Sequence, residues 1–152
     1  IRLTTPQGLR HDVGLELEGK DYKIDFINTG VPHAILFCNS LQSVEVVKLG
    51  RLIRYHDEFM PDGTNADFIK ITDRHNLEIR TYERGVEDET LSCGTGAVAV
   101  ALAASIYQNR KQKSSYLIST PGGDLKVHFN QTTALSFENI WLQGPATLVF
   151  MG

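Results

Sequence analysis

The sequence predicts an α+β fold in which a mainly antiparallel sheet wraps around one central apolar helix. Most segments alternate apolar and polar residues with a period of two, which is typical of strands whose two faces meet different surroundings. One segment, Gly94–Tyr107, is instead apolar on every side. A helix of that composition is normally buried on all sides, so we expect the strands to surround it.

The first third of the chain predicts three strands and a helix. Val13–Glu18 and Tyr22–Ile27 alternate apolar and polar residues, and Gly19-Lys20-Asp21 between them indicates a hairpin turn. His33–Cys38 reads as a short strand with little polar content. Ser43–His56 places its apolar residues at roughly helical spacing.

The middle of the chain predicts a loop followed by a strand pair. Phe59–Asn65 contains Pro, Asp and Gly in succession, which favours a loop. Asp67–Thr72 and Leu77–Glu83 are then predicted to pair through a connection at Asp73–Asn76.

Strands are predicted to resume after the apolar helix. Turns are expected at Gly122-Gly123 and at Asn130-Gln131, because these residue types favour turns. The strands are predicted at Tyr116–Ser119, Asp124–Phe129, Leu135–Leu142 and Thr147–Phe150.

Length and composition fit one domain or one lobe of a larger enzyme. The chain has 152 residues, 41% of them hydrophobic and 22% charged, with a net charge of −3. It has no basic block, which argues against nucleic acid as a partner, and no apolar run near the ~20 residues that span a membrane. Cys38 and Cys93 do not make a disulfide framework, so we expect a cytoplasmic protein with free thiols. The start at Ile1 indicates processing or a fragment of a longer protein.

The segment Ser92-Cys93-Gly94-Thr95-Gly96 carries the clearest chemical signal. It places Cys93 at the N-terminus of the apolar helix, where unpaired N–H groups and the helix dipole favour negative charge. We therefore expect the pKa of this thiol to be lowered. The two glycines leave the backbone open, so the amides can approach a carboxylate. The alternative is a cysteine that only fills space, and a phosphate loop is disfavoured because its lysine is missing.

Other polar residues each have a structural and a functional interpretation. Glu83 and Arg84 end a predicted strand, where charged residues are usually solvated, but Arg84 could bind a carboxylate while Glu83 accepts from an ammonium group. His33 begins a strand and could orient or deprotonate a thiol. Asn65 ends a loop, where Asn is common in turns, and its amide could also bind a substrate head group.

Five groups of residues follow one another along the chain in a fixed order. They are Gly30-x-Pro32-His33, Phe59-x-Pro61-x-Gly63-Thr64-Asn65, Glu83-Arg84-Gly85 with Glu89-Thr90, Cys93-Gly94-Thr95-Gly96, and Gly144-Pro145-Ala146 with Val149-Phe150-x-Gly152. Taken together, these motifs resemble the second half of the diaminopimelate epimerase family, from about Thr4 to the last residue. That resemblance implies a two-lobed, pseudo-symmetric fold, with residues 1–143 forming the C-terminal lobe. Residues 144–152 would form a closing segment that pairs with the missing N-terminal lobe.

The resemblance also implies a reaction. Cys93 would be one of two cysteines that face opposite sides of the substrate α-carbon, and His33 and Glu83 would assist proton movement there. The two cysteines would interconvert LL- and meso-diaminopimelate, on the route to lysine and peptidoglycan, with no pyridoxal phosphate, no other cofactor and no metal. Two cysteines fit the chemistry of inversion, because inversion needs a base on one face of the carbon and an acid on the other.

Five residues would bind this diamino-dicarboxylic acid. Gly94 and Thr95 would hold the reacting α-carboxylate through helix N-terminal amides. Asn65, Glu83 and Arg84 would hold the distal amino-acid end, which is not inverted.

Three departures from the family pattern stand out. The family's other catalytic cysteine, in a Cys-Gly-Asn-type motif, is absent, and Cys38 is a poor substitute because it should point away from His33 into the core. Val31 stands where the family usually has Asn. The connection containing Val86-Glu87-Asp88 is one residue longer than usual. We therefore expect the chain alone to be inactive, with the missing lobe as its partner and a homodimer as a possible assembly.

Two further enzymatic interpretations stay open. One is a related isomerase, of the proline racemase or phenazine-biosynthesis type, although Glu83-Arg84-Gly85 provides for a second amino-acid head group. The other is cysteine-dependent acyl transfer by Cys93 and His33. A carboxylate-binding lobe without turnover is the non-enzymatic alternative.

Overall fold

The computed structural model describes residues 1–109 and 112–144. These form a ten-stranded sheet, two α-helices and one 3-10 helix, and they confirm the predicted α+β class. Thr147–Phe150, which the sequence predicts to be a strand, lies outside the described residues. The elements are β1 (Arg2–Leu3), β2 (Gln7–Leu17), β3 (Lys20–Asn28), β4 (Pro32–Phe37), α1 (Val46–Arg54), η1 (Asp57–Phe59), β5 (Asn65–Ile71), β6 (Asn76–Glu83), β7 (Asp88–Thr90), α2 (Gly94–Tyr107), β8 (Gln112–Thr120), β9 (Gly123–Thr133) and β10 (Ser136–Gln143).

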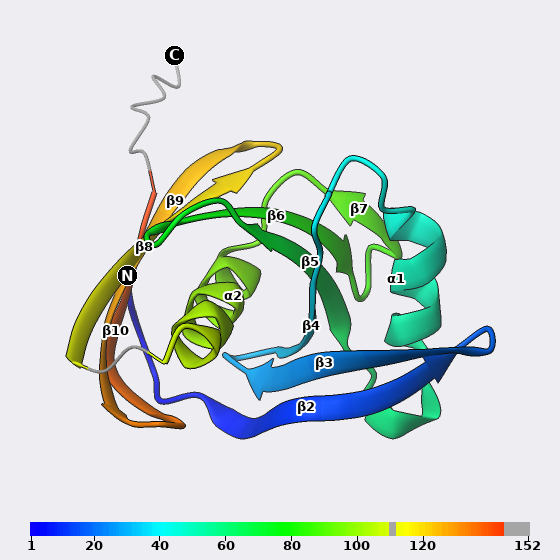
Figure 1. Cartoon of the computed structure of the whole chain (residues 1–152), viewed down its shortest axis with the longest axis horizontal. Coiled ribbons are helices and arrows are strands. Elements are labelled where there is room, and N and C mark those ends of the chain that lie inside the picture. The colour runs from blue at the N-terminus through cyan, green and yellow to red at the C-terminus, as the bar shows by residue number, and fades with distance from the viewer. Residues whose placement is uncertain (110–111, 145–152) are drawn as a thin grey trace, which may run out of the picture.

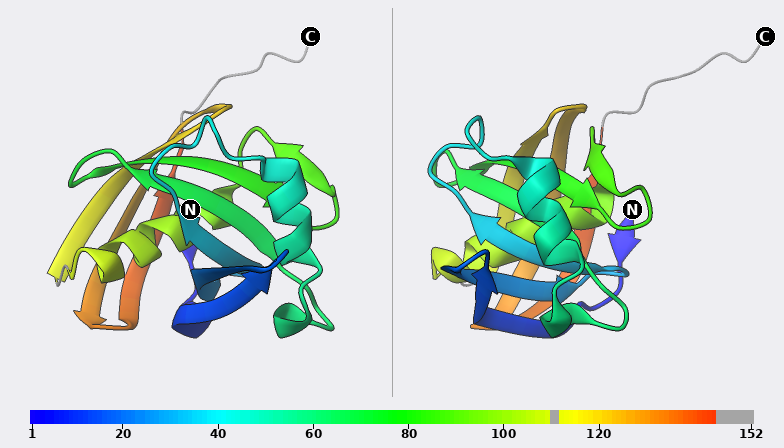
Figure 2. Two further views of the ribbon diagram at one scale, coloured as in Figure 1. Left: turned by 45° about the vertical axis from the view of Figure 1, so that its right-hand side comes forward. Right: turned by 90° about the vertical axis from the view of Figure 1, so that its right-hand side faces the viewer.

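The sheet curls around α2 and carries α1 on its outer face (Figure 1). Its strands run in the order β1-β10-β9-β8-β6-β5-β4-β3-β2, and β7 pairs with β6 off this path. The pairs β4–β5 and β6–β8 are parallel, and the others are antiparallel. Figure 2 shows the same curl from two further sides, with α2 inside it.

Alternation along β5 shows how the sheet separates two apolar cores. Ala66 and Phe68 point to the outer face and pack in the cluster that includes α1 residues. Ile69 points inward, into the cluster built around α2. Residues Gly96 to Ser105 of α2 are all buried, so α2 fulfils the expectation of a helix covered on every side. Its bounds are those predicted from the sequence.

The helix α1 is shorter than the predicted Ser43–His56. Its first residue is Val46, because the chain before it is held by another contact: the Arg80 guanidinium donates to the carbonyls of Leu41 and Val44, at 2.8 and 3.2 Å. Gly50 lies within α1 and is buried against β6. A Cβ at Gly50 would lie 2.4 Å from the Cβ of Tyr82, so the close contact of α1 with the sheet requires glycine there.

Two of the predicted turns lie elsewhere. The β2–β3 hairpin turns at Glu18-Gly19, one residue earlier than expected, and both residues have positive φ, 48° and 79°. The turn predicted at Asn130-Gln131 is wrong, since both residues lie within β9 and the chain turns at Ala134-Leu135. Gln131 can stay in the sheet because its buried amide accepts from the Ser105 hydroxyl and donates to the Ala134 carbonyl.

Two short strands were not predicted from the sequence. β1 pairs Arg2 and Leu3 with Trp141 and Ile140 of β10. β7 adds three residues to the edge of β6 on the way to α2. Neither helix in the described part of the chain has the length and apolar character needed to cross a membrane.

The contact at Gly50 can be tested directly. We expect Gly50→Ala to lower the free energy of unfolding by about 1–2 kcal/mol, because overpacking costs about 1–3 kcal/mol and outweighs the ~1 kcal/mol that alanine gains in a helix. Urea unfolding measures this difference. Gly14→Ala is the matched control, since nothing lies within 4 Å of a Cβ there. Equal stability of the two variants would contradict the role of Gly50.

Candidate active site

The Cys93 thiol lies at the N-terminus of α2, as the sequence predicts. Cys93 is the N-cap residue, with φ −140° and ψ 110°, and its carbonyl accepts the first helical hydrogen bond, from the Ala97 amide at 2.9 Å. The side chain is half-buried. The extended backbone at Cys93 ends the connection from β7, and the following glycines begin the helix.

Polar side chains from three neighbouring strands face this helix end. The register pairs His33 of β4 with Asn65 of β5, and Asp67 of β5 with Thr81 of β6. Directly paired residues share a face of the sheet, and so do residues two apart along a strand. His33, Asn65, Asp67, Thr81 and Glu83 therefore all lie on the inner face, toward α2.

A chain of hydrogen bonds connects these strands to Cys93. His33 is fully buried, its Nδ1 lies 2.6 Å from Oδ2 of Asp67, and its Nε2 lies 2.9 Å from Oγ1 of Thr95. The Thr95 hydroxyl is in turn 3.5 Å from the Cys93 sulfur. The Thr81 hydroxyl donates to Oδ1 of Asp67 at 2.7 Å. His33 and Cys93 thus belong to one site and are bridged by Thr95.

Sequence reasoning missed Thr81 of this site and, more importantly, the buried carboxylate of Asp67. The sequence shows it only as the first residue of a predicted strand. A signal was nevertheless present, because a carboxylate flanked by apolar residues in a buried strand needs a partner.

Gly96 is required because the strands approach the helix closely. A Cβ at Gly96 would lie 2.9 Å from Oδ1 of Asp67, 3.2 Å from Cε1 of His33 and 3.4 Å from the Cys93 sulfur. At Gly94 the nearest atom is the end of the flexible Leu142 side chain, at 2.9 Å. Gly96 therefore has a packing role in addition to the open backbone predicted for it.

Asn65 and Arg84 are brought together at one corner of the site. The Asn65 amide donates to the Pro32 carbonyl at 3.0 Å and accepts from the Arg84 backbone N–H at 2.7 Å. The Arg84 guanidinium donates to the Asp62 carbonyl at 2.8 Å. Asn65 thus joins the ends of β4, β5 and β6, which is a structural role. The substrate-binding roles of Asn65, Glu83, Arg84, Gly94 and Thr95 remain predictions.

The sequence of residues 26–149 matches the model of a protein family described as diaminopimelate epimerase. The chain belongs to the diaminopimelate epimerase family. It is 38% identical over 148 residues to a diaminopimelate epimerase from Aquifex aeolicus, covering 97% of this chain and 52% of that protein. It is 46% identical over 125 residues to one from Flavobacterium psychrophilum, covering 82% of this chain and 48% of that protein.

Solved structures show the same fold at much lower identity. A hydroxyproline epimerase from Agrobacterium vitis superposes with a TM-score of 0.67 at 16% identity, covering 86% of this chain and 44% of the other. A probable proline racemase from Agrobacterium radiobacter gives 0.65 at 14% identity, covering 95% and 52%. In each comparison the chain spans about half the length of its relative.

The predicted lowering of the Cys93 pKa is wrong for this member of the diaminopimelate epimerase family. Burial raises the pKa of the Cys93 thiol, and the carboxylates of Asp67 and Glu83 raise it further, whereas hydrogen bonds from the Thr95 hydroxyl and the Gly96 N–H lower it. The helix N-terminus therefore acts in the predicted direction but is outweighed. The sequence interpretation considered the helix end without the carboxylates that the sheet brings to it.

The second cysteine lies on the other side of the sheet. Cys38 follows β4, donates its backbone N–H to the Ile69 carbonyl at 2.7 Å, and packs with the apolar cluster under α1. Burial raises the pKa of its thiol as well. This agrees with the prediction that Cys38 points away from His33, and it excludes a pairing of the two thiols of this chain across one substrate.

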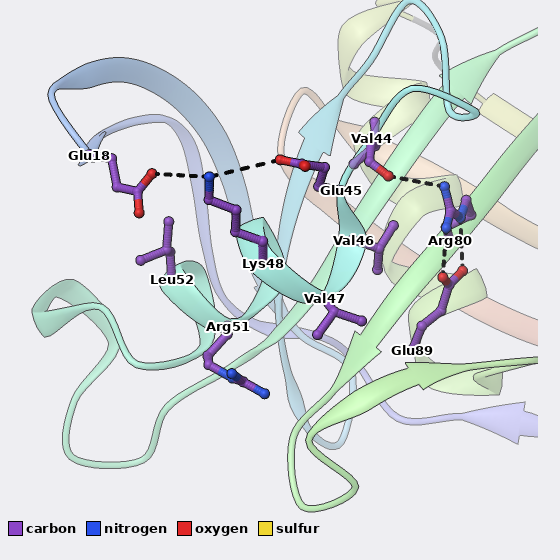
Figure 3. Close-up of a pocket in the computed structure, with 10 residues that line it drawn as sticks. All are labelled: Glu18, Val44, Glu45, Val46, Val47, Lys48, Arg51, Leu52, Arg80 and Glu89. Carbon is purple, nitrogen blue, oxygen red and sulfur yellow. Dashed lines mark hydrogen bonds and ion pairs between the residues drawn. The ribbon is translucent and has the colours of Figure 1, made fainter.

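A hollow beside α1 does not belong to this site. Several of its charged residues pair with one another: Lys48 lies 3.7 Å from Glu18 and 3.9 Å from Glu45, and Arg80 makes an ion pair with Glu89 at 2.7 Å (Figure 3). The hollow lies on the outer face of the sheet. Arg80 precedes the inward-facing Thr81 on β6, and neighbouring residues of a strand point to opposite faces.

One group of described residues could hold a metal ion. It consists of His11, Asp12 and Asp25, whose ligand atoms lie within 4.8 Å of one another, on the β2–β3 hairpin. His11 Nδ1 already lies 2.8 Å from Asp25 Oδ1. Neither Cys93 nor His33 belongs to this group, and the expected independence from metals and cofactors stays a prediction.

The raised pKa of Cys93 has a measurable consequence. We expect its alkylation by iodoacetamide in the folded chain to have a pH midpoint above ~8.5, the usual cysteine value, because the thiolate forms only at higher pH. Peptide mass spectrometry separates Cys93 from Cys38, and the urea-unfolded chain gives the reference. A midpoint for folded Cys93 below that of the unfolded chain would instead support the effect of the helix end.

Proposed function

We propose that this chain supplies one half of the active site of a cofactor-independent epimerase that interconverts LL- and meso-diaminopimelate. One observation carries the proposal: Cys93 lies at the N-terminus of the buried helix α2 and connects through Thr95 to the buried pair of His33 and Asp67. The family match supports the substrate.

The chemistry requires two groups on opposite faces of the α-carbon. Cys93 would take or return the α-proton on one face, and a cysteine of the other lobe would act on the second face. The α-proton of an amino acid is weakly acidic, so the carbanion-like state needs strong support. Backbone amides of Gly94 and Thr95 at the helix start could supply it, since removing one oxyanion donor costs about 2.7–4 kcal/mol in a known enzyme.

The partner of this chain would be the N-terminal lobe of the same enzyme. The chain spans about half the length of its curated relatives. The second cysteine in its sequence lies on the outer face of the sheet, under α1. The closing segment 144–152 that the family resemblance implies lies outside the described residues beyond Gly144. A cytoplasmic location fits the two unpaired thiols.

The distal amino-acid end of the substrate would bind at the corner formed by Asn65, Glu83 and Arg84. Asn65 is 3% exposed, and both the nitrogen and the oxygen of its side-chain amide are hydrogen-bonded. These bonds give the corner a fixed geometry. The half-buried Arg84 guanidinium offers donors for a carboxylate beyond the one used by Asp62. The Glu83 carboxylate on the inner face could accept from an ammonium group.

Replacement of Cys93 tests the proposal. In the full-length, two-lobed protein we expect Cys93→Ala to lower epimerisation of LL-diaminopimelate by at least about 10²–10⁴-fold, the usual contribution of a general acid or base. Polarimetry and α-deuterium uptake in D₂O measure the reaction. Cys38→Ala is the matched control and should retain the rate, because its thiol lies across the sheet.

Other outcomes would replace the proposal. Exchange with proline or hydroxyproline but not with diaminopimelate would indicate a racemase of the related type. A trapped acyl-enzyme at Cys93, without α-deuterium uptake, would indicate acyl transfer.

The chain by itself should not turn over substrate. We expect no interconversion of LL- and meso-diaminopimelate by purified residues 1–152, because the second acid/base group is missing. Addition of the separately produced N-terminal lobe should restore some activity. Turnover by the chain alone would show that the two-lobe proposal is wrong.

A further inference from the structure

We propose that Asp67 is a positioning residue that holds His33 in the tautomer with its proton on Nδ1, so that Nε2 can accept the Cys93 proton through the Thr95 hydroxyl. This inference rests on the proposed function for its catalytic meaning. The arrangement of protons can be tested without any substrate.

The surroundings of Asp67 determine which way its hydrogen bonds run. Its side chain is fully buried, with Oδ2 at 2.6 Å from His33 Nδ1 and Oδ1 at 2.7 Å from the Thr81 hydroxyl. An ionised carboxylate can only accept hydrogen bonds. His33 Nδ1 must therefore carry a proton, and in the neutral imidazole Nε2 is then left as an acceptor.

The Thr95 hydroxyl completes the path to the thiol. Its Oγ1 lies 2.9 Å from His33 Nε2 and 3.5 Å from the Cys93 sulfur. Because Nε2 accepts, the hydroxyl must donate to it, and the hydroxyl oxygen can then accept from the thiol. Thr95 is also held by its carbonyl, which accepts from the Thr29 hydroxyl at 2.9 Å.

The proton transfer balances without any further reactant. The S–H bond of Cys93 breaks as the Thr95 oxygen gains that proton, and the original Thr95 proton forms a bond to His33 Nε2. The products are a Cys93 thiolate and a His33 imidazolium, whose Nδ1–H still donates to the Asp67 carboxylate. Reversal of these steps returns the proton to the thiol.

In this arrangement the hydroxyl and the backbone N–H of Thr95 have separate roles. Its hydroxyl carries the proton between Cys93 and His33, while its backbone N–H, at the start of α2, stays directed toward a substrate carboxylate. Gly96 permits the arrangement, because a Cβ there would meet both Asp67 and His33.

The first test is the tautomer of His33 in the full-length protein, read from ¹⁵N chemical shifts of labelled histidine. We expect Nδ1–H with an unprotonated Nε2 near neutral pH. Asp67→Asn offers an amide that can donate to Nδ1, so the variant should shift His33 to the Nε2–H form. We expect α-deuterium uptake to fall by about 10²-fold or more, as for loss of a general acid or base. Thr95→Val should also lose this exchange but keep the wild-type tautomer.

Asp25→Asn provides the matched control. Asp25 is also a buried carboxylate, and it is bonded to a histidine, His11, at 2.8 Å. This variant should change neither the His33 tautomer nor the exchange rate. If Asp67→Asn does not fold, the wild-type tautomer alone still decides, since an Nε2–H form of His33 overturns the inference.

The two proposals fail in different ways. An active epimerase in which Asp67→Asn leaves the His33 tautomer unchanged would overturn only the role of Asp67. A protein with the expected tautomers but no exchange of diaminopimelate would overturn the proposed function and leave the proton arrangement standing.

Discussion

The complete burial of α2 is the constraint on which the rest of the structure depends. A helix with one apolar stripe can rest on a flat sheet, but α2 is apolar on every side and has to be covered on every side. The sheet meets this requirement by curling, so that β3, β4, β5, β6, β8, β9 and β10 all contact the same helix. Strands that surround one helix also bring their side chains to its end, and this convergence places Cys93 beside residues from β4, β5 and β6.

The polar groups at that end are buried, so they have to satisfy one another. His33, Asp67 and Thr81 are each at most 4% exposed, and every one of them hydrogen-bonds within the group or to Thr95. Removing one member leaves a buried partner without a hydrogen bond, which costs about 1–3 kcal/mol or more for a charged group. Such a network fixes side-chain positions tightly, as a site that moves protons between defined atoms requires.

Local sequence patterns predicted much of the fold and of the candidate site, and contacts between residues distant in sequence determined the rest. The bounds of α2 and the N-cap position of Cys93 follow from the composition of one continuous segment. The start of α1 does not, because Arg80 from β6 holds the preceding carbonyls. Gln131 stays within β9 through a contact with Ser105 of α2. The role of Asp67 and the sign of the Cys93 pKa shift depend on residues from strands separated in sequence, which no local pattern shows.

The raised pKa of Cys93 matters for the proposed two-lobed site because it determines which protonation state of the thiol is favoured. In a two-base mechanism one cysteine carries a proton while the other does not, and burial together with the carboxylates of Asp67 and Glu83 favours the protonated form of Cys93. In the proposed two-lobed enzyme, this chain would then supply the acid for one direction of the reaction. In the reverse direction Cys93 would have to lose its proton, and the proposed path through the half-buried Thr95 to the buried His33 would provide a place for it. The same carboxylate that disfavours the thiolate, Asp67, would then stabilise the imidazolium, so one buried charge would serve both directions of the proposed reaction.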